Sequence, residues 1–178
     1  KLPELKQSGN GYVISAGVSK YSSSSANSLK FSNCVNDAVA YAGFFQSQFA
    51  SIEGGKSLKS YLLTDSVATK EGILNAINET ISNSKPEDYF IFNFSGYCKP
   101  LSDSTGKKVT YFVPYGLKNI GDTNEVKAKS IPLTQLKDLL QLIPADNQLF
   151  ITEAGSTDAF QKEFIQALIN TDSTIAAL

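Results

Sequence analysis

An almost continuous apolar run lies near the middle of the chain and ends at a serine and a glycine. It reads Asp88-Tyr-Phe-Ile-Phe-Asn-Phe-Ser95-Gly96-Tyr97. A run with so little polar alternation is typical of a strand buried on both faces, as in the middle of a parallel sheet. Parallel strands present ligand sites at their carboxyl ends. We therefore look for a functional site where this run ends.

Short apolar strands and amphipathic helices alternate along the rest of the chain. Strands are expected at residues 11–16, 58–63, 109–114 and 148–152, in addition to the central run. The 3.6-residue period predicts helices that start near Asn33 and Thr69, both of which can act as N-caps, and further helices over 133–143 and 160–168. Residues 116–129 are predicted to form a polar loop. This order predicts a doubly wound α/β fold in one domain, residues 11–178, after a linker at 1–10.

The amino-acid composition limits the kinds of partner that the protein can be expected to bind. The chain of 178 residues is 42% hydrophobic and 19% charged, and 16 lysines against 17 acidic residues leave a net charge of −1. This balance predicts no broad attraction to nucleic acid or to an anionic membrane. No apolar run approaches the 18 residues of a membrane span. The two cysteines, Cys34 and Cys98, are few enough to favour a reducing compartment, which suggests a cytoplasmic location.

The absence of histidine has the largest consequence for catalysis. Without it the chain can form neither a Ser-His nor a Cys-His dyad, and nearly all catalytic zinc sites are excluded as well. We expect no metal and no cofactor. A nucleotide-binding module is a weak alternative, because Gly17-Val-Ser-Lys-Tyr21 after the first strand lacks the glycine spacing of a phosphate loop.

Several segments together resemble the caspase-like clan of cysteine peptidases, in its bacterial caspase and metacaspase branch. The resemblance includes Asn33-Cys-Val-Asn-Asp-Ala38 and Phe94-Ser-Gly96, and it covers the large-subunit portion of that fold. The matching segments follow the family order and are residues 13–21, 29–38, 62–74, 85–96, 111–115, 133–140 and 149–154. The resemblance implies a three-layer sandwich with a mainly parallel central sheet and helices on both faces. It also implies that a C-terminal, small-subunit-like portion is missing, which proteolytic processing would explain.

Both positions of the family's catalytic dyad are substituted. The histidine that acts as general base in the family corresponds to Tyr97, and the nucleophilic cysteine corresponds to Gly155. Glycine has no side chain, and a phenol that titrates near 10 is a poor base at neutral pH. Cys98 is expected to be a loop or core thiol, and Cys34 a small hydrophobic residue on a helix face.

The resemblance also implies a pocket for a basic side chain. In metacaspase-type relatives, acidic residues at the positions of Asp37 and Glu153, with a serine at the position of Ser95, line this pocket. Two carboxylates in a partly desolvated site favour lysine or arginine. The alternative is that Asp37 is a structural helix residue and that Glu153 only caps a turn.

The expected function is that of a catalytically inactive caspase-like domain, which acts as a protein-binding, scaffolding or regulatory module. Its partner would be a protein or peptide that can present a lysine or arginine. The alternative is a cysteine endopeptidase of the caspase or metacaspase type, represented by an altered or partial chain.

Overall fold

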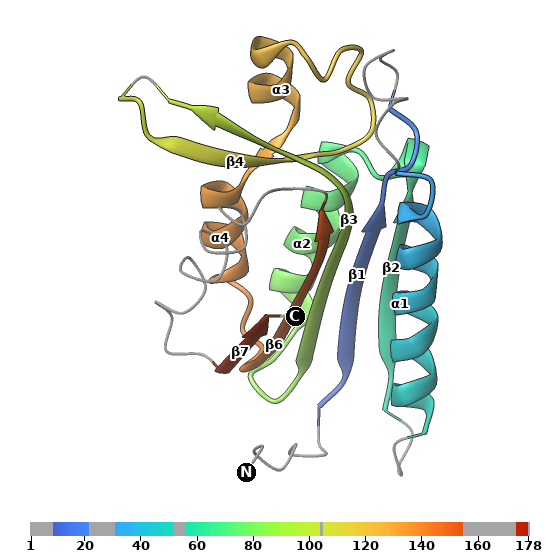
Figure 1. The fold of residues 1–178 in the computed structure, drawn as a ribbon. Helices are drawn as coiled ribbons and strands as arrows, with labels where there is room; N and C mark the ends of the chain where they lie inside the picture. Colours follow the sequence, from blue (N-terminus) through green and yellow to red (C-terminus); the bar gives the residue numbers. More distant parts are fainter. Residues whose placement is uncertain (1–8, 22–30, 52–55, 104, 155–173, 178) are drawn as a thin grey trace.

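The computed structural model describes residues 9–21, 31–51, 56–103, 105–154 and 174–177. Figure 1 shows an open twisted sheet with helices packed against it. The strands are β1 (Gly11–Gly17), β2 (Leu58–Thr64), β3 (Tyr89–Ser102), β4 (Lys108–Val113), β5 (Ile131–Pro132), β6 (Asn147–Ala154) and β7 (Thr174–Ala177). The helices are α1 (Cys34–Ala50), α2 (Lys70–Asn83), α3 (Thr123–Lys129) and α4 (Leu133–Leu140), with a 3-10 turn, η1, at Asp65–Val67.

Strand β3 occupies the centre of the sheet. The first half of β3 lies between β1 and β6 and is parallel to both. Its second half leaves this parallel core and forms an antiparallel pair with β4, which in turn pairs with β5. β2 is parallel to β1, and β7 is parallel to β6. The described residues thus form a mixed sheet of α/β type, in agreement with the predicted α/β class.

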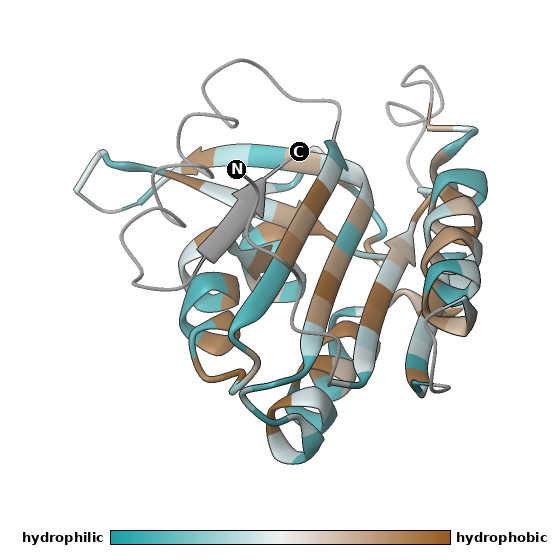
Figure 2. Ribbon diagram, turned by 90° about the horizontal axis from the view of Figure 1, so that it is seen from below, coloured by the Kyte–Doolittle hydropathy of each residue, from teal (hydrophilic) through white to brown (hydrophobic). Residues whose placement is uncertain are grey.

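The alternating side chains of β3 separate two cores. Phe90, Phe92 and Phe94 are fully buried on the face that α2 and α4 cover. Ile91 points to the opposite face, where it packs with Val13 and Phe49 beneath α1. Figure 2 shows α1 on one side of the sheet and the other helices across from it. Because both faces are covered there, the first half of β3 can be almost continuously apolar, as its sequence predicted.

Gly17 allows α1 to approach the sheet closely at the carboxyl end of β1. A Cβ atom at this position would lie 2.3 Å from the carbonyl oxygen of Cys34 and 2.8 Å from Cβ of Ala38. Both distances are shorter than a van der Waals contact, so the first turns of α1 need a glycine beneath them. This contact fixes where the first residues of α1 stand relative to the strand ends.

Two features differ from the sequence-based expectation, and one prediction is not tested. The central strand does not end at Ser95 and Gly96 but continues to Ser102, because residues 97–102 find an antiparallel partner in β4. The predicted polar loop at 116–129 contains α3, whose N-cap Asp122 accepts hydrogen bonds from the backbone N–H groups of Asn124 and Glu125. The predicted helix at 160–168 lies outside the described residues.

The two predicted N-caps should contribute differently to stability. Thr69 accepts a hydrogen bond from the N–H of Gly72 at 3.0 Å, whereas the side chain of Asn33 makes no capping bond. We expect Thr69→Ala to lower the free energy of unfolding by about 1 kcal/mol and Asn33→Ala to lower it by much less. Urea denaturation of both variants measures this difference. Equal losses would mean that the cap bond of Thr69 contributes nothing specific.

Candidate functional site

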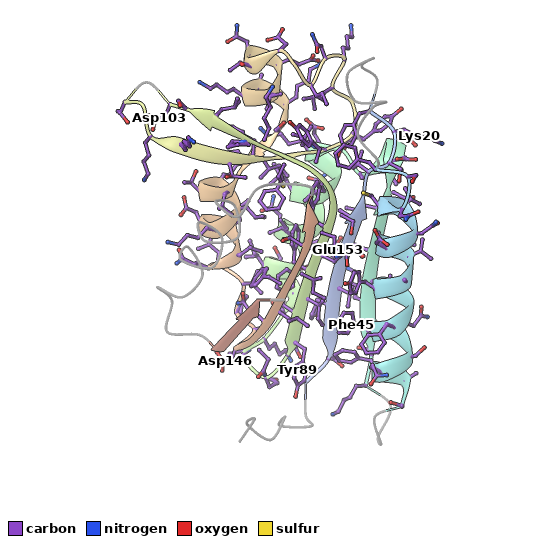
Figure 3. All side chains as sticks on the ribbon, viewed as in Figure 1. Lys20, Phe45, Tyr89, Asp103, Asp146 and Glu153 are labelled. Atoms are coloured by element: carbon purple, nitrogen blue, oxygen red, sulfur yellow. The ribbon has the colours of Figure 1, made fainter. Side chains whose placement is uncertain are left out.

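The candidate site lies at the carboxyl ends of the three central parallel strands. The strand register places Gly17 of β1, Ser95 of β3 and Glu153 of β6 side by side. Figure 3 labels Glu153 at the carboxyl ends of the strands, with Tyr89 and Asp146 at their amino ends. Because neighbouring residues in a parallel register share a face, all three belong to the face that carries α1.

Helix α1 brings two more polar side chains to these strand ends. Ala38 lies over Gly17, and Asp37 and Tyr41 lie on the flank of the helix that reaches Glu153 of β6. The Tyr41 hydroxyl donates a hydrogen bond of 2.9 Å to Oε1 of Glu153, which joins α1 to β6 across the end of β3. The helical period predicted a helix here, but nothing in the sequence indicated this bond.

The carboxyl groups of Asp37 and Glu153 come close to each other. Partial burial, repulsion by the Glu153 carboxylate and a hydrogen bond between the two carboxyl groups raise the pKa of Asp37 above its usual value of 3.8. The two residues predicted to share a pocket are therefore neighbours, from α1 and β6. Their mutual repulsion is a cost that a bound cation would remove.

Ser95 lies at the same place but beneath the surface. Its side chain is fully buried, and its hydroxyl has no hydrogen-bond partner among the described residues. Two residues earlier, the buried Asn93 also carries an unpartnered side-chain NH₂, although its oxygen lies 3.0 Å from the hydroxyl of Ser15. Buried polar groups are normally paired, so unpaired ones next to two carboxyl groups indicate capacity for a ligand.

Tyr97, which the resemblance predicted to replace the family's catalytic histidine, is held in an aromatic cluster. Its ring lies edge-on to the rings of Tyr21 and Phe31, with centroid distances of 6.4 Å and 5.6 Å. Its backbone N–H donates a 2.8 Å hydrogen bond to the Tyr21 hydroxyl, which itself donates to the carbonyl of Val113. Burial raises the pKa of Tyr97, so the phenol is even less able to act as a base than a free tyrosine.

Neither thiol has the environment of an activated nucleophile. Cys98 is fully buried within β3, and burial raises its pKa well above the usual value. Burial and the nearby carboxylates of Asp37 and Glu153 raise the pKa of Cys34 to about 11. A reactive cysteine needs the opposite, namely a lowered pKa beside a positive group. Cys34 and Cys98 therefore contribute to packing, as their sequence positions suggested.

Three further predictions concern Gly155, metal binding and membrane spans. Gly155, the predicted position of the lost nucleophile, is outside the described residues. Among the residues that the structure describes, no three His, Cys, Asp or Glu side chains are grouped so that they could hold a metal ion. In the same part of the chain, no helix has the length and hydropathy required to cross a bilayer.

Comparison with known proteins supports the fold. No family model matches the chain, and no curated protein is significantly similar to it. The chain is similar to the crystal structure of protein GSU0716 from Geobacter sulfurreducens, with a TM-score of 0.61 and 13% sequence identity. The similarity covers 87% of this chain and 55% of that one, so the chain spans about half the length of its neighbour. At this identity the likeness shows a shared fold alone.

Replacing Asp37 should stabilise the protein at neutral pH. The pKa of Asp37 is raised in the folded state, so its ionisation reduces stability as the pH rises through this pKa. We expect Asp37→Asn to raise the free energy of unfolding at pH 7 by a few tenths to about 1 kcal/mol. The gain should shrink as the pH is lowered toward 3.8. Urea denaturation across this pH range measures it, and a variant that is less stable than wild type at pH 7 would contradict the account.

Tyr97 should behave as a packing residue. We expect Tyr97→Phe to be tolerated, because the hydroxyl makes no hydrogen bond with any of the described residues. Tyr97→Ala should lower the free energy of unfolding by about 2 kcal/mol through loss of contacts with Tyr21 and Phe31. Thermal and urea unfolding of the two variants separate these effects. A Tyr97→Phe variant that unfolds as readily as Tyr97→Ala would mean that the hydroxyl, not the ring, matters.

Proposed function

We propose that this chain is a catalytically inactive domain of the caspase-like type that binds a lysine or arginine side chain of a protein or peptide partner. The proposal is carried by the pair of carboxyl groups from Asp37 and Glu153 at the strand ends. The unpartnered hydroxyl of Ser95 stands next to Glu153 in the strand register and adds to it. Such a module would act as a scaffold or a regulator, through binding alone.

The charges of the site favour a cation over other ligands. A guanidinium or ammonium group placed between Asp37 and Glu153 would replace their repulsion by two charge-assisted hydrogen bonds. Tyr41 already holds Glu153 through one of its carboxylate oxygens, so the carboxylate is oriented before the ligand arrives. A preoriented acceptor loses less conformational entropy on binding than a free one. The long, flexible side chains of lysine and arginine suit a site of this kind.

The chemistry around the dyad positions argues against peptide hydrolysis. Thiolate catalysis needs a cysteine of lowered pKa and a base within hydrogen-bond reach. The base position is filled by the tightly packed Tyr97, and both cysteines of the chain have raised pKa values. Binding is the function that these residues can still perform.

The test compares the affinity of the protein for a charged peptide with its affinity for a neutral peptide of the same shape. We expect an acetylated, amidated alanine hexapeptide with one arginine to bind, and the same peptide with citrulline in place of arginine to bind at least tenfold more weakly. Asp37→Asn should weaken arginine-peptide binding by about tenfold, which corresponds to ~1.4 kcal/mol. Isothermal titration calorimetry measures both differences. The affinity should also rise with pH through the raised pKa of Asp37, because the ionised carboxylate is the binding form.

A matched control separates the site from general electrostatics. Asp146 precedes β6 and lies at the amino ends of the strands, opposite to Glu153 (Figure 3). Asp146→Asn changes the net charge by the same amount and should leave the affinity unchanged. Equal affinity for the arginine and citrulline peptides, or equal effects of Asp37→Asn and Asp146→Asn, would overturn the proposal.

A further inference from the structure

Strand β2 forms an edge of the sheet with an unused hydrogen-bonding side. Its only strand partner among the described residues is β1, with which it pairs in an unbroken seven-residue register. The strand contains neither a bulge nor a proline, two devices by which proteins protect a sheet edge. Its single charge, Lys59, is paired with Glu79 of α2. A straight edge of this length can accept a further strand.

The hydrogen bond just before the start of β2 shows which backbone groups of this strand point away from the sheet. The N–H of Gly11 donates to the carbonyl of Ser57, just before the strand, so the odd-numbered residues of β2 face β1. The N–H and C=O groups of a strand residue point to the same side, and successive residues alternate. The even-numbered residues therefore direct their backbone groups away from the sheet, and they are Leu58, Ser60, Leu62 and Thr64.

The surface beside this edge is apolar and uncharged. Leu62 is 42% exposed and stands opposite Ser15, whose hydroxyl donates to the carbonyl of Ala38 in α1. Val39, 48% exposed, follows Ala38 on the flank of α1 opposite to Asp37, which faces β6. Leu62 and Val39 are therefore two exposed apolar side chains on the α1 side of the sheet. The four residues of β2 that direct their backbone groups outward are also uncharged, namely Leu58, Ser60, Leu62 and Thr64.

We propose that β2 pairs in an antiparallel manner with β2 of a second copy of this chain, which joins the two sheets about a two-fold axis at Tyr61. This inference is independent of the proposed function. In this register Ser60 lies opposite Leu62 of the second copy, and Leu58 opposite Thr64. All four outward-facing residues of each strand then form hydrogen-bonded pairs. The two Tyr61 rings meet across the axis, where a cross-strand aromatic pair is favourable.

The charge pattern of β2 suits a second copy. A strand that pairs with itself must not bring like charges together. Lys59 stands two residues from the axis, so the two Lys59 side chains are separated by four residues along the strands, or about 14 Å. This exceeds a Debye length of about 8 Å at physiological ionic strength, and each ammonium already has Glu79 as a partner. The exposed Leu62 and Val39 of both copies lie on the same face of the joined sheet and cover each other across the axis.

Sedimentation equilibrium of the chain over a wide concentration range tests the association. We expect a monomer–dimer equilibrium in wild type. Leu62→Lys should weaken it at least tenfold, because the two introduced lysines would occupy diagonal positions about 8 Å apart across the two-fold axis. Leu142→Lys replaces another exposed leucine, 61% exposed and outside β2, and should leave the equilibrium unchanged. Circular dichroism checks that both variants are folded.

Cysteine cross-linking tests the register. Tyr61→Cys places two thiols on the axis, with Cα atoms about 4.5 Å apart in a non-hydrogen-bonded pair, which is within disulfide range. Leu62→Cys places them about 8 Å apart, too far for a disulfide. We expect a mild oxidant to cross-link the first variant and not the second, while the native Cys34 and Cys98 stay buried.

Four outcomes would overturn the proposal. A chain that stays monomeric at all concentrations rules out the dimer, and a dimer that Leu62→Lys and Leu142→Lys weaken equally must use another surface. Cross-linking through Leu62→Cys but not Tyr61→Cys would mean a different register. Capture of an extended peptide by monomeric protein, lost in Leu62→Lys, would show that the edge serves a different strand.

Discussion

The burial of β3 on both faces and along both edges is the constraint on which the rest of the structure depends. Its phenylalanines fill the core under α2 and α4, and Ile91 fills the core under α1. A strand this apolar is stable only between two parallel neighbours, and β1 and β6 supply them. The same arrangement brings the ends of three strands to one edge. The location of the candidate site is thus a consequence of how the core is covered.

Two regions at these strand ends differ in character. The residues around Tyr97 are packed together, whereas those around Asp37 have the properties of a binding site. Around Tyr97, three aromatic rings pack edge-on, and the Tyr21 hydroxyl accepts from the Tyr97 N–H and donates to the carbonyl of Val113. Around Asp37 the opposite holds, because two carboxyl groups repel each other and the nearby Ser95 hydroxyl is unpaired. Stable proteins rarely keep such costs without a use. This contrast is the physical basis for proposing a site that binds a basic side chain and does not hydrolyse peptides.

The features that the sequence could predict are those that depend on local pattern. The buried strands, the helix periods and the cap of Thr69 follow from residues near each other in the chain. The extension of β3 past Gly96 depends on pairing with residues 108–113, which no local pattern indicates. Helix α3 had a local signal, Asp122 followed three residues later by Glu125, but its seven polar-rich residues show little apolar period. The bond between Tyr41 and Glu153 joins residues 112 positions apart and requires the fold.

The most direct test of the account is to incubate the wild-type chain, at high concentration, with a library of peptides containing lysine and arginine and to follow it by mass spectrometry. The account predicts that peptides with a basic residue are retained on the protein and recovered intact. A chain variant with Tyr97→His and Gly155→Cys, run in parallel, shows whether the assay can register cleavage on this scaffold. Cleavage after lysine or arginine by the wild-type chain would contradict the central claim.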